Sequence, residues 1–141
     1  MNKKTLAEKI VKTMYSHDGF SAWLGVEIVK AEPGNCVLRM IVRHEMLNGF
    51  GIAHGGITYS LADSALAFAS NSHGRKAVSV ETSISHTEPL RENDVITATA
   101  EEINLTNKIA LYHITISTED GRKVAFFKGT VYITSQNWFP E

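Results

Sequence analysis

One cysteine, no long apolar run and almost no net charge characterise this 141-residue chain, and each scarcity excludes a class of protein. A lone cysteine, Cys36, rules out an intramolecular disulfide and a CxxC site, so we expect a buried thiol. No segment approaches the roughly 20 apolar residues that span a bilayer, and the N-terminus lacks the apolar stretch of a signal peptide. A net charge of -1 without a basic stripe argues against a nucleic-acid partner. We therefore expect a cytoplasmic protein that binds neither membranes nor nucleic acids.

A single domain over residues 1–141 is expected, because 43% hydrophobic residues in a chain of this length suffice for one core. Helical spacing over residues 6–15 precedes a short turn at 20–24, and segments rich in Val, Ile and Thr predict strands on both sides of a long helix. The expected strands are Leu24 to Ala31, Cys36 to Val42, Ala77 to His86, Val95 to Leu105, Ile109 to Glu119 and Lys123 to Thr134. This order predicts an α+β protein, a curved antiparallel sheet wrapped around one long central helix.

The strand over residues 78–85 is polar on one side. We expect it at an edge of the sheet, paired with a second subunit, because a long unpaired edge invites uncontrolled association. A homo-oligomer is therefore predicted.

The run from Asn48 to Asp63 is the most informative stretch, because a glycine-rich turn leads into a helix with one isolated carboxylate. On a helical wheel the apolar residues fill an arc of roughly 200°, which predicts a helix enclosed by a curved sheet. Asp63 is the only formal charge between His54 and His73. The narrower polar arc, which faces solvent, an interface or a site, holds Ser60, Asp63, Ser64, Ala67, Ser70 and Asn71.

The start of this helix suits acyl transfer. The first N–H groups of a helix have no intrahelical partner and lie at the positive end of its dipole, so they stabilise a developing oxyanion. Gly55 and Gly56 lack a Cβ, which lets a carbonyl approach the backbone. A carboxylate such as Asp63 is ionised at neutral pH, and the chain has no Gly-x-Ser-x-Gly elbow of a serine hydrolase. Taken singly, Asp63 also fits a solvated residue, and His54 fits an N-terminal cap or a hydrogen-bonded core imidazole. The combination of Asn48, Gly-Gly and a carboxylate further into a buried helix favours a site.

This segment, with Asn48, His54-Gly55-Gly56 and Ser60-Leu61-Ala62-Asp63, closely resembles the hot-dog fold acyl-CoA thioesterases of the phenylacetate-degradation (PaaI) type. The similarity runs along nearly the whole chain and includes Met46 to Gly49, Asn71 to Gly74 and Phe126 to Gly129. It implies a hot-dog fold and hydrolysis of acyl-CoA thioesters, of the aryl-acetyl or short- to medium-chain kind, to free acid and coenzyme A. The acyl group itself is not specified by these motifs.

The resemblance also implies roles for individual residues. Asp63 matches the nucleophile or the general base for water, and the Gly55 N–H matches the donor that polarises the thioester carbonyl. Asn48 and His54 match positions that orient substrate or water. The family's sites lie between subunits, with the Asp supplied by the partner, and a homotetramer built from two hot-dog dimers is implied. No metal and no separate cofactor is implied, since coenzyme A is part of the substrate.

The chain departs from the family pattern before Pro89. Many members have Arg where this chain has Glu88, and an apolar residue is common at the position of His86. If that Arg binds the phosphates of coenzyme A, its role has moved to other cations or is missing here. The candidates are Arg91, Lys108, Arg75 and Lys76.

Two other functions are compatible with the fold. A hot-dog acyl-CoA hydratase or dehydratase would act on the acyl chain by proton transfer, but the chain lacks an Asp-x-Asn-x-x-His stretch of that type. A non-catalytic acyl-CoA-binding sensor usually carries an output domain, and the N-terminal helix is too short for a DNA-binding unit. Thioester hydrolysis is the leading prediction.

Overall fold

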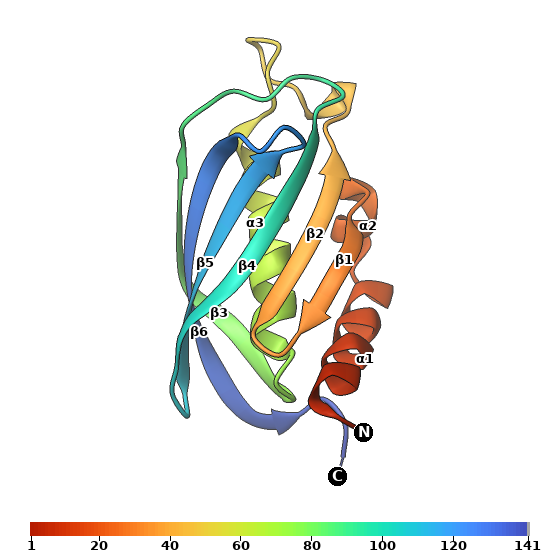
Figure 1. The fold of residues 1–141 in the computed structure, drawn as a ribbon, viewed down its shortest axis with the longest axis vertical. Helices are drawn as coiled ribbons and strands as arrows, with labels where there is room; N and C mark the ends of the chain where they lie inside the picture. Colours follow the sequence, from red (N-terminus) through yellow and green to blue (C-terminus); the bar gives the residue numbers. More distant parts are fainter. Residues whose placement is uncertain (141) are drawn as a thin grey trace.

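A computed structural model of the chain, which describes residues 1–140, contains a curved six-stranded antiparallel sheet around one long helix (Figure 1). Its helices are α1 (Lys3–Ser16), α2 (Gly19–Leu24) and α3 (Gly55–Asn71), with a 3-10 turn at His44–Met46. Its strands are β1 (Glu27–Glu32), β2 (Asn35–Ile41), β3 (Arg75–His86), β4 (Val95–Leu105), β5 (Ile109–Thr118) and β6 (Lys123–Asn137). They lie in the order β1-β2-β4-β5-β6-β3. The predicted hot-dog arrangement is confirmed.

The helix α3 lies against one face of the sheet, with most of its side chains buried (Figure 1). Where the helix passes over β6, a Cβ added at Gly129 would lie 2.6 Å from Cδ2 of Leu66. Only glycine fits there without displacing Leu66, which is 1% exposed. Gly129 therefore makes room for Leu66 of the helix, and the predicted enclosure of the helix is confirmed.

The exposed part of α3 is narrower than the predicted polar arc. Ser64 is buried beneath α2, where its hydroxyl lies 2.8 Å from the Ser21 hydroxyl. Asn71 is buried because the Trp138 indole N–H donates to its side-chain oxygen at 2.9 Å, and Ser70 is buried as well. The wheel did not show that α2 and the C-terminal segment cover these positions. One stripe of small or polar residues keeps some exposure: Gly56 is exposed, and Ser60, Asp63 and Ala67 are partly exposed.

The two edges of the sheet differ. β1 is six residues long and packs against α1 (Figure 1). β3 is twelve residues long, pairs only with β6 among the described strands, and exposes Val78 and Val80 by 56% and 60%. The predicted edge position of residues 78–85 is confirmed, and this edge is available for pairing.

The start of the first strand differs from the sequence expectation, whereas the state of Cys36 agrees with it. The first strand begins at Glu27 and not at Leu24, because α2 continues to Leu24 and is capped by Gly25. Cys36 is a buried free thiol as expected, and burial raises its pKa to about 12. No helix among residues 1–140 is long and apolar enough to span a membrane.

Candidate active site

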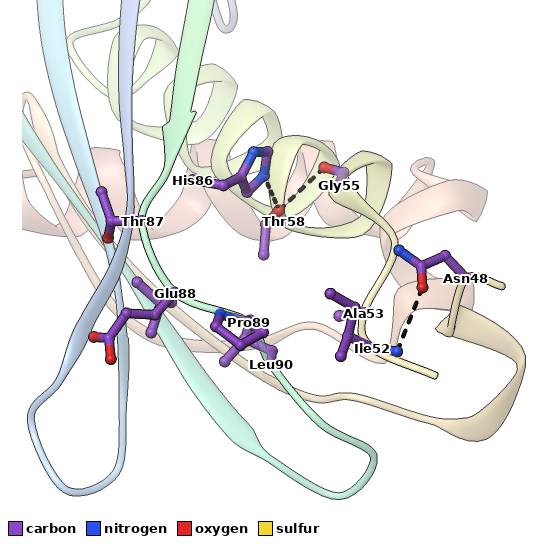
Figure 2. A pocket seen from close by; sticks show the side chains of 11 residues that line it. Asn48, Ile52, Ala53, Gly55, Thr58, His86, Thr87, Glu88, Pro89 and Leu90 are labelled. Atoms are coloured by element: carbon purple, nitrogen blue, oxygen red, sulfur yellow. Dashed lines mark hydrogen bonds between the residues drawn. The ribbon is translucent and has the colours of Figure 1, made fainter. Parts of the chain in front are cut away.

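A cavity of about 500 Å³ opens at the N-terminal end of α3 (Figure 2). Its wall combines the first turn of α3, the segment that leads into it and the end of β3 with the loop that follows. The lining residues are Asn48, Ile52, Ala53, Gly55, Thr58, His86, Thr87, Glu88, Pro89, Leu90 and Val124. Of the predicted site residues, this cavity brings together Gly55 and Asn48.

Only one of the two glycine amides is open at this cavity. The Gly56 N–H donates to Nδ1 of His54 at 3.0 Å, so His54 is the N-cap of α3. The Gly55 N–H donates to no group within residues 1–140. His54 itself lines a different hollow, beside Phe20 and Trp23. The Gly55 N–H is therefore free to donate to a ligand, whereas the Gly56 N–H is bound by His54.

His86 was not predicted as a site residue, yet it lies against Gly55. A Cβ added at Gly55 would be 3.3 Å from Cε1 of His86. Thr58 donates its hydroxyl hydrogen to the Gly55 carbonyl at 3.0 Å, and Nε2 of His86 lies 2.6 Å from the same hydroxyl oxygen (Figure 2). Since that oxygen has one hydrogen to give, Nε2 of the imidazole must carry the hydrogen of the second bond. Thr58 and His86 thus hold the carbonyl side of the peptide whose N–H His54 holds.

Asn48 shapes the segment before α3. Its side-chain oxygen accepts from the Phe50 N–H at 2.9 Å and from the Ile52 N–H at 3.4 Å. Its side-chain nitrogen, on the side of the segment that leads into α3 (Figure 2), donates to no group within the described part of the chain. Asn48 therefore has a free donor at the edge of the cavity.

Asp63 lies elsewhere, in a cleft of about 400 Å³ between α3, the first half of β3 and the C-terminal segment. Ser79, Lys76 and Trp138 line the same cleft. The side chain is half-buried. Burial raises the pKa of the Asp63 carboxyl above its ordinary value, and the negative charge of Asp18 raises this pKa further. A carboxylate stripped of part of its water in this way is a stronger proton acceptor than one at the surface.

Within one chain, Gly55 and Asp63 do not converge. Eight residues of helix separate them, a rise of roughly 12 Å, and they line different cavities. One substrate carbonyl cannot contact the Gly55 N–H and the Asp63 carboxylate of the same chain at once. Two copies of the chain could supply the two groups to one site.

Charged groups surround the Gly55 cavity differently from the sequence expectation. Glu88 lines the cavity and accepts from Arg122 at 3.3 Å, and Asp120 lies 3.5 Å from the same guanidinium. Arg91 is exposed in the loop after β3. Arg75 and Lys108 lie at the opposite end of β3, where Arg75 donates to the Asn107 carbonyl at 2.6 Å. Sequence reasoning missed Arg122 because nothing in its hairpin indicates which loop it faces.

Among residues 1–140, no three His, Cys, Asp or Glu side chains lie close enough together to hold a metal ion. An open backbone N–H, a side-chain amide and an imidazole lie together at the Gly55 cavity, and a carboxylate with a raised pKa lies apart from them in the Asp63 cleft. These are the donor and the proton acceptor of a carbonyl-addition reaction.

Comparisons with known proteins agree with this chemistry. Residues 50–125 match the thioesterase superfamily. The acyl-coenzyme A thioesterase PaaI of Escherichia coli K12 is 37% identical over 82% of this chain and 83% of its own length. The solved structure of the PaaI protein from the E. coli phenylacetic acid degradation operon superposes with a TM-score of 0.94, at 32% identity, over 96% of this chain and 99% of that one. A hypothetical thioesterase of Streptococcus pneumoniae, solved with coenzyme A, gives a TM-score of 0.77 at 28% identity, over 79% of this chain and 88% of that one.

Proposed function

This chain belongs to the thioesterase superfamily and is a thioester hydrolase, and on this basis we propose that it cleaves acyl-CoA thioesters in a site shared by two subunits. The observation that carries the proposal is the pair of groups on α3, an open Gly55 N–H at its first residue and a half-buried Asp63 in a separate cleft. Relatives named as acyl-CoA thioesterases, and one solved with coenzyme A, support this substrate class.

In the proposed reaction, Asp63 of one subunit faces the Gly55 cavity of the other. Acting as a base, its carboxylate takes a proton from water while the water oxygen bonds to the thioester carbon. The carbonyl oxygen gains the negative charge, and the Gly55 N–H donates to it. The carbon–sulfur bond then breaks, coenzyme A leaves as the thiolate and takes the proton held by Asp63, and the acid is released. Direct attack of the carboxylate on the carbonyl carbon is the alternative role for the same residue.

The open stripe of α3 and the free edge of β3 support a two-fold dimer. Pairing of two β3 strands would extend the sheet across both subunits and remove its exposed edge. The stripe of Gly56, Ser60, Asp63 and Ala67 has side chains small enough to let a second α3 approach closely. A tetramer of two such dimers follows from the sequence resemblance, and sedimentation analysis measures it directly.

His54 and Asn48 have distinct roles in this proposal. His54 fixes the Gly56 peptide, so it positions the Gly55 N–H without contacting substrate. Asn48 has a free amide nitrogen at the cavity, which orients the substrate or the attacking water.

Subunit mixing tests the shared site. Gly55→Pro, which lacks the N–H, and Asp63→Ala should each lose on the order of 10²-fold or more in kcat while remaining assembled. After exchange, a hybrid dimer has one site with both intact groups and one with neither. Because random exchange makes roughly half of the dimers hybrid, about a quarter of wild-type activity should return.

Release of free thiol from a panel of aryl-acetyl, short- and medium-chain acyl-CoA substrates is the readout, with hydration of enoyl-CoA measured beside it. No recovery despite demonstrated exchange would place both groups in one subunit's site. Clean hydration without thiol release would favour the hydratase. Circular dichroism and sedimentation of each variant control for the strain that proline could introduce at position 55.

A further inference from the structure

The first turn of α3 begins with two adjacent glycines, so its own residues restrain it weakly. Gly55 and Gly56 have no side chain, and a glycine loses more conformational freedom on ordering than any other residue. The first N–H groups of a helix also lack the intrahelical bonds that hold later residues. An N–H group that must point at one carbonyl oxygen therefore needs restraint from outside the helix.

Local hydrogen bonds give this turn its shape. The His54 carbonyl accepts from the Ile57 N–H at 2.9 Å, and Nδ1 of His54 accepts from the Gly56 N–H at 3.0 Å. The Thr58 hydroxyl donates to the Gly55 carbonyl at 3.0 Å. Since all of these groups lie between residues 54 and 58, the bonds keep the turn together but do not orient it relative to β3.

His86 supplies the link from this turn to the sheet. It is the last residue of β3, and its Nε2 lies 2.6 Å from the Thr58 hydroxyl oxygen (Figure 2). Because that hydroxyl gives its own hydrogen to the Gly55 carbonyl, the two bonds run in one direction, from imidazole N–H to hydroxyl to carbonyl. Hydrogen bonds in such a chain strengthen one another.

The bond from His86 also selects the conformation of Thr58. A threonine in a helix divides between two χ1 rotamers, because its hydroxyl can bond a carbonyl of the preceding turn. Thr58 is buried, and within residues 1–140 His86 is the only donor to its hydroxyl oxygen. Without the imidazole, one bond instead of two would hold the hydroxyl against the Gly55 carbonyl.

A separate contact keeps α3 on β3. The Tyr59 hydroxyl is hydrogen-bonded to the Thr82 hydroxyl of β3, and the Tyr59 ring packs edge-on against Phe127. Neither contact involves the Gly55 carbonyl. The helix would therefore stay on the sheet without His86, and only its first turn would become less well oriented.

We propose that His86 is a positioning residue for thioester hydrolysis, which acts through the Thr58 hydroxyl to keep the Gly55 N–H pointed at the substrate carbonyl oxygen. The proposal rests on the hydrolysis proposed above. His86 neither takes nor gives a proton in it. Its effect falls on the transition state, in which the oxygen carries the negative charge, and not on substrate binding. An imidazole at a position where the resemblance has an apolar residue thereby gains a role.

Kinetics of thiol release test the role of the imidazole N–H. His86→Phe, which keeps a ring and loses the N–H, should lower kcat by about three- to tenfold and leave KM unchanged. His86→Gln, whose amide nitrogen reaches the position of Nε2, should recover most of this loss, whereas the shorter His86→Asn should not. Tyr59→Phe removes a hydrogen bond between the same two elements and is the matched control, with unchanged kcat. An equal loss in Tyr59→Phe, or a change in KM alone in His86→Phe, would overturn the proposal.

A double-mutant cycle tests whether His86 acts through Thr58. Thr58→Val keeps the shape of the side chain and removes its hydroxyl. In this background His86→Phe should lower kcat little further, because the link is already broken. In Thr58→Ser, which keeps the hydroxyl, the loss caused by His86→Phe should return. The same fold-loss with and without the hydroxyl would mean that the imidazole acts on the substrate directly, and would overturn the proposal.

Amide exchange tests the positioning without turnover. In His86→Phe the Gly56 N–H should exchange with deuterium severalfold faster than in the wild type, because the turn that protects it is less well held. The temperature of thermal unfolding should stay the same, since the imidazole is exposed. An unchanged exchange rate would overturn the proposal. A wild-type protein that releases no thiol would overturn the proposed function, and the exchange rate would still decide whether His86 holds the turn.

Discussion

Two causes raise the pKa of the Asp63 carboxyl. The packed helix and strand around it withhold water, and this burial is the larger cause of its raised pKa. The charge of Asp18 adds to the effect. Asp18 also caps α2 by accepting from the Ser21 N–H at 2.9 Å, and the Ser21 hydroxyl contacts Ser64 of α3. A structural cap therefore also tunes the proposed catalytic base.

This arrangement predicts a pH effect of Asp18→Asn. Asp63 acts as a base only when ionised, so kcat/KM falls as pH drops through its raised pKa. Asparagine removes the negative charge that helps raise this pKa, and the acid limb should move to lower pH. It should stay above the limb of an ordinary carboxyl, because burial is unchanged. A pH profile of thiol release measures the shift.

Asparagine remains a good N-cap, so thermal unfolding of Asp18→Asn should change little and serves as the control. A limb displaced to higher pH, or no displacement in a variant of unchanged stability, would contradict the electrostatic coupling between these two carboxyls.

At the level of elements, a glycine of the sheet lies beneath α3 and makes room for one of its side chains. Gly129 of β6 faces Leu66, whose side chain is almost fully buried. The N-terminal turn is fixed separately, by His54 on one side and by Thr58 with His86 on the other. Different residues therefore determine how α3 packs on the sheet and how its first N–H group is oriented.

Gly129→Ala should lower the free energy of unfolding by about 1–3 kcal/mol, since the new methyl group overlaps the Leu66 side chain. Combined with Leu66→Ala, it should cost less than the sum of the two single changes, because the smaller side chain makes room. Urea unfolding of the four proteins in the cycle measures this coupling. Gly19→Ala, where an added Cβ meets nothing within 4 Å, is the control and should change stability by less than about 0.5 kcal/mol. Strict additivity at positions 66 and 129 would refute the steric explanation.

Periodicity was enough to predict these elements, because apolar spacing reports directly on which face a helix or strand buries. It predicted the enclosed α3 and the edge position of β3. It could not predict that Ser64 is covered by Ser21, since that depends on where α2 docks. The contact of His86 with Thr58 was equally inaccessible: it joins residues 28 positions apart, at the point where β3 passes the first turn of α3.

For the whole molecule, the two edges of the sheet differ, and in the proposed dimer this difference determines which edge pairs. The α1 helix packs against β1, whereas β3 presents unpaired backbone groups and two exposed valines. Asp63 lies in a different cavity from Gly55 of its own chain, and in the proposed dimer it faces the Gly55 cavity of the second copy.

A charge placed on the free edge should therefore abolish activity by separating the subunits. Val80→Lys should yield monomers with unchanged circular dichroism and strongly reduced thiol release, because a lysine in the middle of an edge strand opposes pairing. Val29→Lys, on β1 at 55% exposure, is matched to it and should remain assembled and active. Sedimentation velocity distinguishes the two. Assembly that survives Val80→Lys and fails in Val29→Lys would place the interface at the other edge.

The strand order β1-β2-β4-β5-β6-β3 also has a consequence for how the chain is made. β3 leaves the ribosome before β4 and β5, yet its only partner in the described sheet is β6, the last strand synthesised. Pairings between segments so far apart in sequence form late and slow folding. Until β6 emerges, Val78 and Val80 lie on a segment with both sides unpaired, the arrangement most prone to aggregation. Translation that stops before residue 123 should thus yield an aggregation-prone chain, and in the proposed dimer β3 can pair correctly with its partner only after β6 has been made.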